Sequence, residues 1–73
     1  MARKFTVVIE REGDGYTALC PELDIASEGG TLTEARANLQ EAIELFLETA
    51  SIEEKQRRLS DEVYITQIEV ADA

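Results

Sequence analysis

The longest amphipathic stretch of the chain runs from Thr31 to Ala50. Apolar side chains recur in it at steps of three and four residues, the spacing that places them on one face of a helix. They are Leu32, Ala35, Leu39, Ala42, Ile43, Phe46 and Ala50. Thr31 and Glu34 form the T-x-x-E pattern of a capping box, which marks a helix start. The pattern predicts one long helix that covers a sheet, because the other segments are short and extended in pattern.

Alternation of apolar and polar residues predicts strands on both sides of this helix. Strands are expected over residues 4–11, 16–20, 25–28 and 63–70. Glycines in the segment Glu12–Gly15 favour a tight hairpin turn between the first two strands. The resulting order is β-β-β-α-β. We therefore expect a single α+β domain over residues 1–73, with one face of its sheet covered by one main helix.

The opposite face of the sheet has no obvious cover. Val8, Leu19, Val63 and Ile65 have the phase to lie on it. An uncovered apolar face is a candidate association surface, although single surface aliphatics are also ordinary. A chain of 73 residues buries only about 60% of the surface that its unfolded form exposes. A homodimer or higher oligomer would therefore add stability.

A second capping pattern, S-x-x-E, follows the long helix at Ser51 to Glu54. It predicts a short helix over residues 52–59, and the alternative is that the long helix continues into this segment. Lys55, Arg57 and Arg58 form a small basic cluster there. We interpret the cluster as stabilising the carboxyl end of a helix, where positive charge is favourable.

Charge limits the class of partner. Sixteen acids against seven bases give a net charge of −9. Such a surface repels nucleic-acid phosphates, so we expect no direct nucleic-acid binding. A basic protein or a metal ion would be attracted, and acidity also serves solubility alone.

The rare residue types exclude several kinds of site. The chain has no histidine and one cysteine, Cys20, so it has no internal disulfide and no Cys/His nucleophile, and a zinc site is not expected. Cys20 is interpreted as a small buried hydrophobe. A single cysteine fits a reducing cytoplasm. No apolar run approaches the roughly 20 residues of a membrane span, and no signal-peptide core is present, so we expect a cytoplasmic protein.

Several acids invite comparison with a two-metal nuclease, whose ions lie about 4 Å apart. They are Glu10, Asp14, Glu22, Asp24 and Glu28. Most stand in turns, where acids are favoured for local hydrogen bonds. We therefore expect no enzyme, no catalytic residue, no metal and no cofactor. A metal-dependent nuclease of ribonuclease H type is kept as an alternative.

The centre of the chain resembles a known family. The segments that carry the likeness read YTALCPELD (residues 16–24), EGGTLTEA (28–35) and LQEAIELFLE (39–48). Together they resemble the HicB family of antitoxins from prokaryotic toxin–antitoxin modules, with the likeness running from about residue 5 to residue 48. The resemblance implies a truncated ribonuclease H-like fold that does not cut RNA. It implies binding to a small basic RNA-cleaving toxin of HicA type, whose active site the antitoxin masks.

Many members of that family carry a DNA-binding domain after this one. Only three residues follow Val70, so we expect no such domain and no autorepression by this chain. A solitary self-associating module without a toxin is a second alternative.

The expected partner-binding residues lie mainly on the long helix. A step of about 100° per residue places Glu34, Glu41, Glu44 and Glu48 on one side, away from the apolar stripe. Leu45 falls on this acidic side. It is either a docking anchor or a residue covered by the 51–62 segment, and we favour the cover. The partner-binding set is Asp24, Glu41, Glu44, Leu45 and Glu48.

Overall fold

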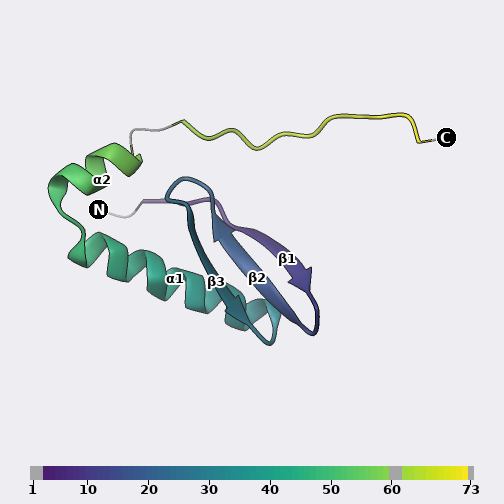
Figure 1. Cartoon of the computed structure of the whole chain (residues 1–73), viewed down its shortest axis with the longest axis horizontal. Helices are drawn as coiled ribbons and strands as arrows, with labels where there is room; N and C mark the ends of the chain where they lie inside the picture. Colours follow the sequence, from purple (N-terminus) through teal and green to yellow (C-terminus); the bar gives the residue numbers. More distant parts are fainter. Residues whose placement is uncertain (1–2, 60–61, 73) are drawn as a thin grey trace.

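The computed structural model describes residues 3–59 and 62–72. Three strands precede two helices: β1 (Val8–Glu12), β2 (Gly15–Cys20), β3 (Ile25–Gly29), α1 (Leu32–Thr49) and α2 (Ile52–Leu59). The strands form an antiparallel sheet in the order β1-β2-β3. Figure 1 shows α1 lying along one face of this sheet. The α+β class and the sheet covered on one face by one main helix are thus confirmed.

The hairpin between β1 and β2 closes over two residues. Glu12 pairs with Gly15, so the loop consists of Gly13 and Asp14. Gly13 has a φ of 60°, a conformation that glycine adopts without steric cost. Glycine at the first loop position is typical of a type II′ turn, whose twist matches that of the flanking strands.

The first strand begins later than expected, at Val8 rather than residue 4. The backbone N–H of Thr6 donates to the carboxylate of Glu22, at 3.2 Å from Oε1 and 3.0 Å from Oε2. The side chain of Glu22 therefore takes the donor that a neighbouring strand would otherwise use. Residues 3–7 approach the sheet without belonging to it.

The start of α1 follows the predicted capping box. The backbone N–H of Glu34 donates to Thr31 Oγ1 at 3.1 Å, and Glu34 Oε2 accepts from the N–H of Gly30 at 2.9 Å. Gly29 allows β3 and α1 to touch, because a Cβ at this position would lie 2.4 Å from the backbone nitrogen of Ala35. The connection between β3 and α1 is therefore fixed by the two hydrogen bonds of the capping box and by the close contact at Gly29.

The core lies between α1 and the sheet. Its fully or nearly fully buried side chains are Ala18, Cys20, Leu23, Ala35, Leu39 and Ile43. α1 packs mainly against β3 and β2 and makes the fewest contacts with β1. Phe5 before β1 and Ile9 within it are consequently only half-buried. The first strand is the least protected part of the sheet.

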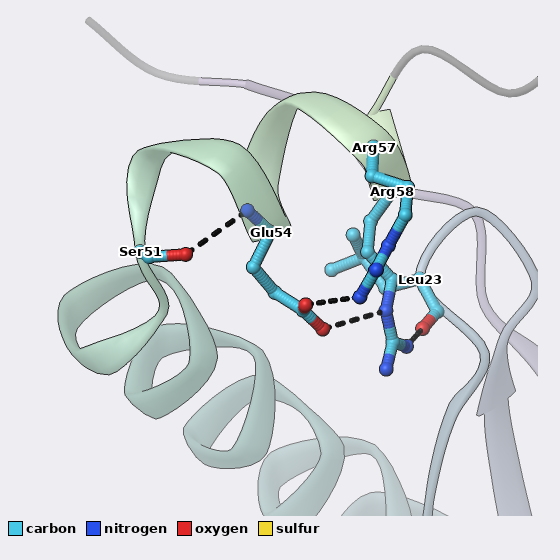
Figure 2. Close-up of polar contacts among 5 residues, drawn as sticks. All are labelled: Leu23, Ser51, Glu54, Arg57 and Arg58. Carbon is cyan, nitrogen blue, oxygen red and sulfur yellow. Dashed lines mark hydrogen bonds and ion pairs between the residues drawn. The ribbon is translucent and has the colours of Figure 1, made fainter.

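α2 is a separate helix, so the alternative of one continuous helix is wrong. α1 ends because Ala50 is extended, with φ −70° and ψ 146°. α2 restarts with Ser51 Oγ accepting from the N–H of Glu54 at 3.1 Å. The carboxylate of Glu54 then binds the guanidinium groups of Arg57 and Arg58, and Arg58 donates to the carbonyl oxygen of Leu23 (Figure 2).

The strand expected over residues 63–70 is not part of the sheet. Residues 62–72 run as an extended and exposed segment that leaves the body of the molecule (Figure 1). The pattern of the segment is that of a strand, but a strand exists only when its backbone pairs with another. Within the described chain the segment has no such pairing.

Candidate functional site

The outer face of α1 carries four of the five expected partner-binding residues. Glu41, Glu44, Leu45 and Glu48 are all exposed, and together they are called the acidic ridge below. Their spacing of three and four residues places them on one side of the helix, opposite the buried residues of α1. Leu45 is 59% exposed. The ridge therefore presents one large aliphatic side chain framed by three carboxylates.

The expected cover over Leu45 is wrong. α2 is held elsewhere, because Arg58 donates to the carbonyl of Leu23 and lies 5.5 Å from the centre of the Phe46 ring. Leu59 at the end of α2 packs against the core. α2 is thus held beside the β2–β3 turn and Phe46, and Leu45 stays exposed. Local sequence could not show this, since Arg58 and Leu23 are 35 positions apart.

Asp24 and Glu34 do not join the acidic ridge. Glu34 is used in the cap of α1. Asp24 lies in the turn between β2 and β3 with a φ of 54°, a left-handed conformation that aspartate and asparagine tolerate better than most residues. It is exposed and lines a hollow with Arg57 and Arg58. If Asp24 contacts a partner, it does so beside α2 and away from the acidic ridge.

The basic cluster has a more specific role than expected. The sequence predicts that these residues stabilise the end of a helix, and Arg57 and Arg58 do lie in the last turn of α2. Arg58 also reaches the carbonyl of Leu23 and the carboxylate of Glu54 (Figure 2). Its guanidinium lies over the ring of Phe46. Its main effect is to fix α2 against the rest of the fold.

The open face of the sheet is divided in two. The strand register aligns Val8, Leu19 and Ala26 across the three strands, so these side chains form an apolar end of the face. Glu10, Thr17 and Glu28 align in the same way at the acidic end. The expectation for Val8 and Leu19 is confirmed. Val63 and Ile65, expected beside them, lie on the extended segment instead.

Glu22 is an important residue whose role the sequence did not reveal. Besides the backbone N–H of Thr6, its carboxylate accepts the Thr6 hydroxyl at 2.6 Å from Oε2. Partial burial alone would raise the pKa of Glu22, but the hydrogen bonds from Thr6 and from its own backbone outweigh this effect and lower the pKa. Glu22 therefore anchors the segment before β1 in its ionised form. The two residues are 16 positions apart, so no local signal indicated the pair.

The remaining candidate groups are the thiol of Cys20 and the acidic side chains of the described residues. Cys20 is fully buried, as expected, and burial raises the pKa of its thiol. A raised pKa keeps the thiol protonated and unreactive. Among the residues that the structure describes, no three acidic, cysteine or histidine side chains lie close enough to hold a metal together. Neither helix in the described ranges is long and apolar enough to cross a membrane.

Two curated proteins of Synechocystis sp. are similar to this chain. One UPF0150 protein is 41% identical over 64 residues, which make up 85% of this chain and 88% of that protein. The chain belongs to the UPF0150 family. A second UPF0150 protein of the same organism is 49% identical over 47 residues, 62% of this chain and 60% of the relative. No family profile and no solved structure matches the chain.

The similarity to the first UPF0150 protein extends over most of both chains, so the relation concerns the whole α+β unit. The names of these relatives state no activity and no partner.

Proposed function

We propose that this chain is an antitoxin-like module that binds a small basic RNA-cleaving toxin of HicA type and masks its active site. The observation that carries the proposal is the acidic ridge, in which an exposed leucine is framed by carboxylates. Exposed apolar side chains that become buried supply binding energy, and the charges around them select a partner of opposite sign.

The wider surface supports a basic partner. The net charge of −9 attracts cationic proteins at long range and speeds their encounter. The resemblance of residues 5–48 to HicB antitoxins points to the same class of partner. In this proposal the protein acts in the cytoplasm, where the toxin would meet RNA, and it acts by binding without catalysis.

The test begins with a search of the neighbouring reading frames for a small basic protein, which is then purified and assayed for RNA cleavage. The wild-type chain is expected to bind it and to stop the cleavage at equimolar ratio. Leu45→Ser should weaken binding at least about tenfold, because a central apolar anchor contributes on the order of 2 kcal/mol. The double variant Glu41→Gln, Glu48→Gln should mainly slow association, because ridge charges act by steering.

The matched control is Glu53→Gln on α2, which removes the same charge from an exposed position outside the ridge. It should bind nearly as the wild type does. Asp24 should be replaced by asparagine, since alanine would be strained at a φ of 54°. Failure of the wild type to inhibit cleavage would overturn the proposed function. Unchanged affinity of Leu45→Ser for the toxin would show that the acidic ridge is not the binding surface.

A further inference from the structure

We propose that residues 62–70 form a strand on a second copy of this chain, added to the free edge of β1, so that two copies exchange these segments. The segment is extended and exposed along its whole length in the single chain. Tyr64 is 80%, Ile68 81% and Val70 73% exposed. Burial of such side chains against a partner is favourable, because it removes apolar surface from water.

The segment has the composition of a buried or half-buried strand. Six of the eight residues from Val63 to Val70 are β-branched or tyrosine, and the stretch contains no proline or glycine. Tyr64, Thr66, Ile68 and Val70 share one face, while Val63, Ile65, Gln67 and Glu69 lie on the other. The first face is suited to an apolar surface, and the second face is polar only at its carboxyl end.

β1 offers the edge that fits best. Among the described residues β1 pairs only with β2, and α1 covers β3 much more than β1. Along the start of β1, Phe5 and Ile9 are half-buried and Val7 is 37% exposed. An added strand would satisfy the unpaired backbone of β1 and place its apolar face beside these side chains. Unpaired edges are the usual template for such addition.

The shape of the single chain favours a second copy as the source of the strand. The radius of gyration is 14.5 Å, whereas a compact chain of 73 residues should have about 11 Å. The excess comes from a segment that points away from its own sheet (Figure 1). A second copy supplies the missing edge for each segment, and a two-fold axis makes the exchange reciprocal. A basic partner is less suited, because Glu69 is the only charge between Val63 and Val70.

The first experiment measures mass by sedimentation from micromolar to near-millimolar protein, with the full chain. The wild type is expected to dimerise. Ile68→Pro should raise the dimer dissociation constant at least about tenfold, because proline removes a strand donor and forces the backbone out of register. Residue 68 lies outside the folded body, so the helix content by circular dichroism should stay the same. Ile52→Ser, the matched loss of an exposed isoleucine on α2, should still dimerise.

The second experiment identifies the edge. Val7→Cys and Ile68→Cys chains, mixed under mild oxidation, should form a disulfide between unlike chains, while wild type with its buried Cys20 should not. A monomeric wild type, or a dimer that Ile68→Pro leaves intact, would overturn the exchange. A chain that carries both Val7→Cys and Ile68→Cys gives a further check. A disulfide that forms only within that chain would also overturn the exchange, since the segment would then pair with its own sheet. These results do not depend on the toxin, and loss of toxin binding would leave them unchanged.

Discussion

At the residue scale, Glu22 shows how one carboxylate fixes a chain segment that lacks regular structure. Its two oxygens accept from the N–H and the hydroxyl of Thr6. The Cys20 thiol also lies 3.6 Å from Oε1. Hydrogen bonds to an ionised acceptor are about twice as strong as neutral ones. The segment before β1 is therefore held by charge more than by burial.

The lowered pKa of Glu22 predicts how stability depends on pH. A carboxyl whose folded pKa is depressed stabilises the fold above its unfolded pKa, and this contribution is lost as pH falls through the folded value. Glu22→Gln should therefore lower the free energy of unfolding at pH 7 by about 1 kcal/mol. At a pH below the folded pKa of Glu22 the difference from wild type should disappear, because both side chains are then neutral.

Urea unfolding at the two pH values would measure this effect, with Glu41→Gln as the control. Glu41 is exposed on α1, and its loss should change stability by less than about 0.5 kcal/mol at either pH. An equal cost of Glu22→Gln at both pH values would show that shape, and not charge, holds Thr6.

The exposure of the ridge carboxylates and the burial of Ala35, Leu39 and Ile43 in α1 could be predicted from the sequence, since helical spacing alone decides which side chains face the sheet. The left-handed conformation of Asp24 could not, because its turn is closed by the packing of β2 and β3. The Thr6–Glu22 pair was equally hidden. Local periodicity reports which way a side chain points, but not what it meets.

At the element scale, α2 depends on tertiary contacts. It has eight residues, and isolated helices of that length are not stable in water. Arg58 connects it to Leu23 and pairs with Glu54 within α2 itself (Figure 2). It also lies over the face of Phe46 on α1. Because the guanidinium satisfies a carbonyl outside any helix, it joins the β2–β3 turn to both helices.

Arg58→Ala should release α2 while α1 and the sheet stay folded. We expect faster amide hydrogen exchange in residues 52–59 and a loss of about 1–2 kcal/mol in the free energy of unfolding, as for a lost charged hydrogen bond. Gln56→Ala is the control on the same helix, since Gln56 is exposed and alanine favours a helix at least as well as glutamine does. Similar exchange in the two variants would contradict a fixing role for Arg58.

The elements themselves could largely be predicted, and their assembly only in part. The caps at Thr31 and Ser51 mark the starts of both helices, and glycine in a two-residue loop marks the hairpin. The segment from Val63 to Val70 has a strand pattern, but its pattern does not name the edge that it pairs with. The sequence specifies a strand, whereas the fold of one chain does not include it.

At the scale of the whole molecule, the charge of −9 affects the two proposed interactions in opposite ways. Two copies repel each other at long range, whereas a basic toxin is attracted. Raising the ionic strength from about 0.01 M to about 0.15 M shortens the Debye length from about 30 Å to about 8 Å. That change removes most of the interaction between charges on separate molecules of this size, whose radius of gyration is 14.5 Å.

Added salt should therefore tighten the homodimer and loosen the complex with the toxin. Over this range we expect the dimer dissociation constant to fall several-fold, and that of the toxin complex to rise about tenfold or more, chiefly through slower association. Sedimentation and stopped-flow binding would measure the two at matched salt. The contact between copies is mainly apolar, so it should survive high salt, while the encounter with the toxin relies on carboxylates. If both equilibria weakened with salt, the contact between copies would have to be ionic, and an exchange of the apolar segment could not be its basis.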